Sequence, residues 1–103
     1  MRIKSGVRFA SPEMAMMMAT LVVQQVYVEL DSRGTCRLVV TGAVEGHKHP
    51  SKHIYGGGLD FRTRDLSGVN KGEFARLCRY RLGDGFDVVL EESHLHVEYD
   101  YKD

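Results

Sequence analysis

The chain has 103 residues, with 14 basic and 14 acidic side chains. This length is typical of one domain, and the charge balance lacks the basic excess of nucleic-acid-binding proteins and the acidic tail of disordered segments. Hydrophobic residues make up 43% of the chain and charged residues 27%, as in ordinary globular proteins. We therefore expect a single domain over residues 1–103, without a nucleic-acid partner.

The most apolar stretch, residues 14–28, contains Thr20, Gln24 and Gln25 and is too short and too polar to span a bilayer. The N-terminus lacks the pattern of a secretory signal peptide. We expect a monomer that is cytoplasmic as synthesised and has no membrane span. Cys36 and Cys78 are too few for a disulfide framework, and each lies among apolar residues. Both are expected to be reduced core residues, although a disulfide between them stays open.

The first half predicts a short strand at residues 7–9 and then a helix. Ser11 is a suitable N-cap, Pro12 fits the first helical position, and the helix is expected to run to about Glu29. Its methionine-rich start favours a helix buried nearly all round, with a soft binding surface as the alternative. A turn at residues 31–34 and a β-branched strand at residues 36–41 follow.

The second half begins with a long loop, residues 42–57, which leads to a short strand at residues 59–62. Asn70 and Glu73 are spaced as a capping box for a second helix, which Gly83 is expected to end. Two strands are predicted at residues 86–90 and 94–99. The fold class is therefore α+β, a small antiparallel sheet with two main helices.

Histidines gather in two places, the long loop and the last strand. His94 and His96 are alternate residues of a strand, so their side chains are expected to share one face. Two neighbouring imidazoles suit a metal ligand and an adjacent acid–base group better than a hydrophobic core. His47 and His49 are interpreted as solvated loop residues, with a place beside the cleft or in contact with substrate as the alternative.

A second group of polar residues surrounds three consecutive glycines. His53 and Asp60 are seven residues apart across Gly56, Gly57 and Gly58, which we expect to fold tightly and bring both side chains to one point. Two histidines, one carboxylate and an open position make a catalytic zinc site.

The segment from Ser51 to Asp60 fits S-x-H-x-x-G-x-A-x-D, with Gly58 in place of the alanine, and residues 94–96 fit H-x-H. Together the motifs resemble the zinc peptidase group that includes D-Ala-D-Ala carboxypeptidases, L-alanyl-D-glutamate endopeptidases, lysostaphin-type endopeptidases and the hedgehog signalling domain. The chain looks closest to short, often phage-encoded members of the D-Ala-D-Ala peptidase branch, over about residues 38–99.

The resemblance implies that zinc is bound by His53, Asp60 and His96, and that His94 is a catalytic histidine. Many members place an acidic general base at the position held here by Ser93. Glu92 is the candidate substitute, with a solvated turn carboxylate as the alternative.

The candidate substrate-binding residues are Ser51, Tyr55 and Arg62, with Arg64 as the alternative to Arg62. For Ser51 and Tyr55, structural roles beside the site are the alternative. The predicted function is a zinc metallopeptidase that hydrolyses peptidoglycan stem peptides or related short peptides, acting at the bacterial cell wall. The alternative is a zinc-stabilised binding module with little or no hydrolytic activity.

Overall fold

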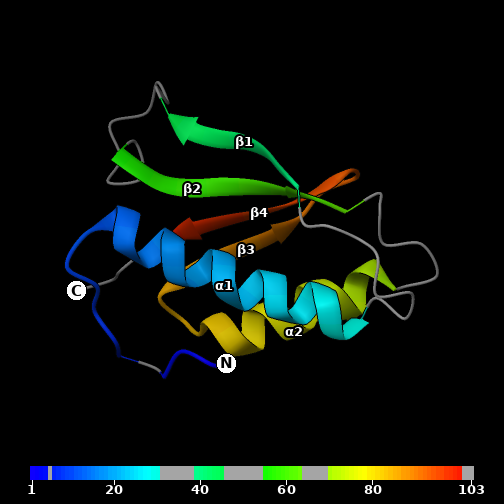
Figure 1. Cartoon of the computed structure of the whole chain (residues 1–103), viewed down its shortest axis with the longest axis horizontal. Helices are drawn as coiled ribbons and strands as arrows, with labels where there is room; N and C mark the ends of the chain where they lie inside the picture. Colours follow the sequence, from blue (N-terminus) through cyan, green and yellow to red (C-terminus); the bar gives the residue numbers. More distant parts are fainter. Residues whose placement is uncertain (5, 31–38, 46–54, 64–69, 101–103) are drawn as a thin grey trace.

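The computed structural model describes residues 1–4, 6–30, 39–45, 55–63 and 70–100. Within these ranges the chain forms two helices and a four-stranded antiparallel sheet of order β1-β2-β4-β3, with both helices on one face of the sheet (Figure 1). The elements are α1 (Pro12–Leu30), β1 (Val40–Glu45), β2 (Tyr55–Arg62), α2 (Lys71–Leu82), β3 (Phe86–Leu90) and β4 (His94–Tyr99). The predicted α+β class with an antiparallel sheet and two main helices is confirmed. Neither helix is long and apolar enough to cross a membrane.

The helix ends follow local signals in the sequence. The Ser11 hydroxyl accepts a hydrogen bond from the Met14 N–H at 3.1 Å, which caps α1 as predicted. Asn70 caps α2 by accepting the Glu73 N–H at 3.2 Å. The Glu73 carboxylate binds Arg76 instead of the cap, so only half of the expected capping box forms. Gly83 ends α2 with a φ of 84°, a conformation that glycine adopts without strain.

The core lies between the helices and one face of the sheet. Its largest fully buried side chains come from α1, α2, β2 and β4, and include Tyr27, Phe61, Phe74, Leu82 and Leu95. The rings of Tyr27 and Phe74 meet edge to face at 6.0 Å, which joins α1 to α2. Cys78 is buried and reduced, as predicted. Burial raises the pKa of its thiol to about 12.

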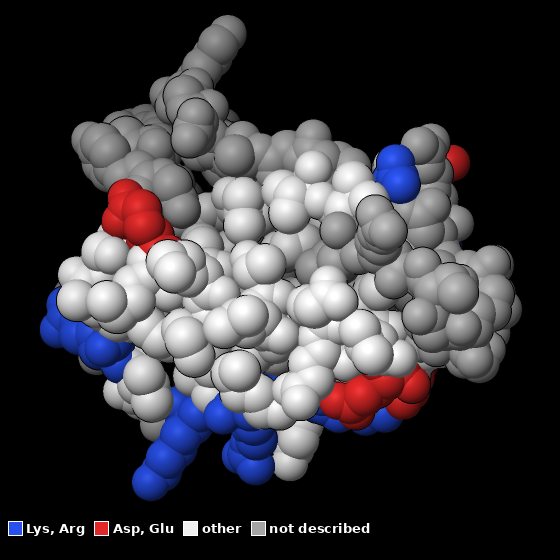
Figure 2. Space-filling model, viewed as in Figure 1, with Lys and Arg blue, Asp and Glu red and all other residues white. Residues whose placement is uncertain are grey.

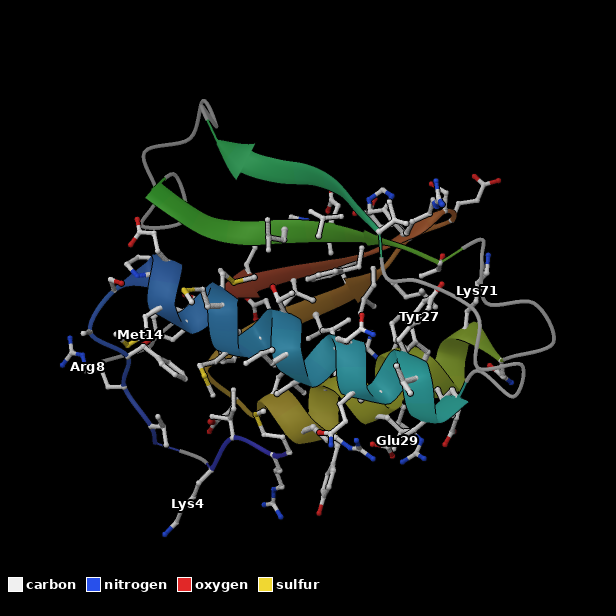
Figure 3. All side chains as sticks on the ribbon, viewed as in Figure 1. Lys4, Arg8, Met14, Tyr27, Glu29 and Lys71 are labelled. Carbon is white, nitrogen blue, oxygen red and sulfur yellow. The ribbon has the colours of Figure 1, made fainter. Side chains whose placement is uncertain are left out.

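The interpretation of α1 as buried nearly all round is wrong. Met14, Met17, Leu21 and Val28 lie on an outward side and are between 48% and 70% exposed. In Figure 2 this side has little charge along its length, and Figure 3 labels Met14 and Glu29 near its two ends. Both sides of α1 are therefore apolar: one packs in the core, and the other is exposed.

Residues 7–9 do not form a strand. The Phe9 ring packs edge to face on Tyr99 and Phe86, and the Phe9 N–H donates to the Tyr99 hydroxyl at 3.2 Å. This backbone donor is thus satisfied by a side chain instead of a neighbouring strand.

Strands β1 and β2 also differ from the prediction. β1 extends to Glu45, into the predicted loop, while residues 31–38 lie outside the described residues. β2 begins at Tyr55 and contains all three consecutive glycines, so they are extended strand residues and do not form a tight turn. Positive φ angles occur only at Gly6 and Gly83 in the part of the chain that the structure describes.

Candidate metal centre

The polar residues of β4 lie on the face of the sheet opposite α1 and α2, which is called the helix-free face because neither of the two described helices covers it. Along this strand His94, His96 and Glu98 are partly exposed, whereas the alternate residues Leu95, Val97 and Tyr99 are buried in the core. This alternation confirms that His94 and His96 share a face, and it separates them from the hydrophobic core.

β2 brings the predicted aspartate to the same face. In the antiparallel pairing of β2 with β4, Asp60 stands directly opposite His96, and Arg62 stands opposite His94. Phe61, between them, is fully buried in the core. Directly opposed residues on one face of a sheet have side chains within contact distance. The register of two strands therefore places Asp60 against His96, although they are 36 residues apart in the sequence.

His96 lies between two carboxylates. Its Nδ1 is 2.5 Å from the Asp60 Oδ1, and its Nε2 is 2.6 Å from the Glu98 Oε1. A carboxylate oxygen only accepts, so both contacts are hydrogen bonds at once when both ring nitrogens carry a proton. This arrangement therefore suits the imidazolium form of His96.

The pKa of His96 is raised above its ordinary value. Partial burial alone lowers this pKa, but the hydrogen bonds to Glu98 and Asp60 and the negative charges of both carboxylates outweigh that effect. A metal ion that binds at Nδ1 must displace the proton that this environment favours.

His94 lies beside this pair. Its Nε2 is 3.7 Å from the Asp60 Oδ1 and 3.4 Å from the Glu91 Oε1, and its Nδ1 is 3.3 Å from the Ser93 hydroxyl. Its side chain is 28% exposed, so solvent and small molecules reach the ring. Glu92 precedes β4, and Lys71 donates to its backbone carbonyl. Of the two glutamates before β4, Glu91 is thus the one whose carboxylate the structure places next to His94.

The donor set fits zinc as far as it is described. Asp60 and His96 supply one carboxylate oxygen and one imidazole nitrogen at the same point, both of them normal zinc ligands. Two ligands of a tetrahedral zinc ion stand about 3.4 Å apart, so the 2.5 Å contact is a hydrogen bond that metal binding would replace. The described residues contain no ready group of three or more metal-binding side chains.

Several of the residues named in the sequence analysis lie outside the described residues or at the ends of β2. His53 and Ser51 lie outside the described residues, as do His47 and His49. Tyr55 is the first residue of β2 and Arg62 is its last.

Glu91 and Glu98 are site residues that the sequence analysis missed. Glu98 follows His96 by two positions, so the same alternation that pairs His94 with His96 would have placed it on their face. The contact between Glu91 and His94 spans the turn before β4 and has no comparable periodic signal.

Comparison of the chain with models of known protein families, with curated proteins and with solved structures finds no significant match.

Proposed function

We propose that this chain is a zinc-dependent peptidase that hydrolyses peptidoglycan stem peptides or related short peptides, with a D-Ala-D-Ala-peptidase-like fold. The observation that supports it most is the meeting of Asp60 and His96 on the helix-free face, with His94 beside them. Two motifs at distant positions in the sequence, each resembling the zinc peptidase pattern, thus contribute to one cluster of side chains.

In this proposal His96 and Asp60 hold the metal, and His53 is the third ligand. When bound, zinc supplies Lewis acidity, which lowers the pKa of a water molecule and polarises a carbonyl group. The hydrogen bond between His96 and Asp60 keeps the two side chains together in the metal-free chain. Little reorganisation of β2 and β4 is therefore needed for binding.

His94 is the proposed proton carrier. Its Nε2 faces both the Asp60 and Glu91 carboxylates, at 3.7 Å and 3.4 Å. A histidine in this position can give a proton to a departing amine or stabilise negative charge on a substrate oxygen. Glu91 is the better-placed carboxylate partner, while Glu92 remains a prediction.

Arg62 is the proposed substrate anchor. It stands opposite His94 on β2, with the next residue inward along the strand, Phe61, in the core. A guanidinium on this face suits the carboxylates of peptidoglycan stem peptides. Ser51 and Tyr55 remain candidate substrate-binding residues.

Two substitutions test the proposal. His96→Ala should abolish zinc binding and hydrolysis. His94→Ala should keep zinc but lower the rate of peptide hydrolysis about 10²-fold or more, because it removes only proton transfer. Purified peptidoglycan fragments are the substrate, and zinc is measured by elemental analysis.

The outcomes separate the two functions. Zinc bound without hydrolysis in the unmutated chain would favour the zinc-stabilised binding module. An unchanged zinc content in the His96 variant would refute the site itself.

A further inference from the structure

Glu98 is the one acidic side chain of β4 and reaches the nitrogen of His96 that faces away from Asp60. Its Oε1 is 2.6 Å from His96 Nε2, and its side chain is 19% exposed. On β2 the residue opposite Glu98 is Gly58, which has no side chain to compete for the same space. The carboxylate is therefore partly withdrawn from water at the point where it accepts the hydrogen bond.

We propose that Glu98 is a positioning residue for His96, which fixes Nδ1 as the metal-binding nitrogen by accepting the Nε2 proton. This inference rests on the proposed zinc site and assigns a role within it to a residue outside both motifs.

The chemistry follows from the two nitrogens of one ring. A neutral imidazole has one N–H donor and one lone pair, and the hydrogen bond of one nitrogen decides which is which. A carboxylate accepts but cannot donate, so Glu98 keeps the proton on Nε2. Nδ1 faces the proposed ligand Asp60 at 2.5 Å, so it is the nitrogen whose proton a metal ion would replace, and its lone pair would then be free for the metal.

The same contact strengthens the ligand. A carboxylate that accepts from a metal-bound histidine orients the ring and raises its basicity, and loss of such a partner weakens metal affinity about 10–100-fold. Glu98 contacts the opposite edge of the ring from Asp60. It therefore acts through His96, whereas Asp60 is placed to bind the metal directly.

The test is the zinc affinity of the full chain, measured by competition with a chromophoric chelator. Glu98→Ala should weaken zinc binding about 10–100-fold. Glu98→Gln should restore affinity to within a few-fold of the unmutated chain, because its amide oxygen still accepts the Nε2 proton. Circular dichroism checks that each variant is folded, and Glu98→Gln, with nearly the same shape, keeps the test valid if the alanine variant unfolds.

Asp87→Asn is the matched control. Asp87 stands directly opposite Glu98 on β3, so its substitution removes one negative charge from the same part of the sheet without removing the contact with His96. It should change zinc affinity less than threefold. Equal losses in Asp87→Asn and Glu98→Ala would overturn the inference, because they would indicate a general effect of charge.

A second readout follows the ring itself. In the zinc-bound chain, ¹⁵N-detected NMR of His96 should show a proton on Nε2 and a metal-shifted Nδ1. An Nε2-bound metal would overturn the assignment, as would unchanged zinc affinity in Glu98→Ala. Failure of the unmutated chain to bind zinc at all would refute the proposed function instead.

Discussion

Leu95 and His96 are neighbours on β4 whose side chains point to opposite faces of the sheet. Alanine substitutions at the two positions therefore distinguish effects on the stability of the fold from effects on zinc binding. Leu95 is fully buried, whereas the His96 side chain is 18% exposed on the helix-free face. Leu95→Ala should lower the free energy of unfolding by about 2–5 kcal/mol, through lost apolar burial and the cavity left behind. For a domain of this length, such a loss lowers Tm by ~10 °C or more.

His96→Ala should cost less, about 1–3 kcal/mol, because it removes hydrogen bonds to two partly exposed carboxylates and leaves the core intact. Its effect on zinc should be larger. Zinc at 100 times its Kd stabilises a folded site by about 2.7 kcal/mol. The unmutated chain and Leu95→Ala should both gain this increment, and His96→Ala should gain none.

Urea unfolding at low temperature, with zinc or with chelator, measures both quantities. An increment that persists in His96→Ala would refute the assignment of the ligand. Loss of the increment in a folded Leu95→Ala would refute the division of β4 into a core face and a metal-binding face.

Three further predictions concern the rest of the fold. Asn70→Ala should destabilise the chain by about 0.5–2 kcal/mol in urea unfolding, because the first turn of α2 loses its cap; no loss would mean that water replaces the cap. Cys78 should resist alkylation at pH 8–9 in the folded chain and react after unfolding. Burial raises the pKa of Cys78 from 9.0 to about 12, so the folded chain favours the neutral thiol. The contribution of this thiol to the free energy of unfolding is fully present below pH 9 and is lost as the pH rises toward 12. Cys78→Ala should therefore flatten the pH dependence of unfolding in that range, and an unaltered curve would contradict the burial argument. Met17→Gln, at a position 70% exposed, should change stability by less than about 0.5 kcal/mol, and a larger loss would mean that the outward side of α1 is covered.

The parts of the fold that were predictable depend on neighbouring residues. Ser11, Asn70 and Gly83 act on backbone groups within a turn of themselves, so the sequence carries the whole signal for these helix ends. The period of two along β4 likewise places His94 and His96 together without knowledge of any other strand.

The sequence-based predictions that were wrong concern segments whose structure depends on residues far away in the sequence. Residues 7–9 are rich in strand-forming side chains, yet Phe9 bonds to the Tyr99 hydroxyl, 90 residues away. The three consecutive glycines, ending at Gly58, are extended as part of β2, a central strand that lies between β1 and β4, and Gly58 itself pairs with Glu98 on β4. Such pairing outweighs the local freedom of glycine.

The candidate site shows the same division. Asp60 and His96 could be named from their motifs, but their contact depends on the register between β2 and β4. Glu91 reaches His94 only through the turn before β4. Contacts that depend on a turn or on the register of two strands are thus harder to read from sequence than those, such as Glu98 with His96, that follow the period of one strand.

The most direct test of the account is zinc content, measured by elemental analysis on protein purified without chelator and paired with hydrolysis of purified peptidoglycan fragments. The account predicts about one zinc per chain and cleavage that a chelator stops. Protein that folds normally and contains no zinc would contradict it.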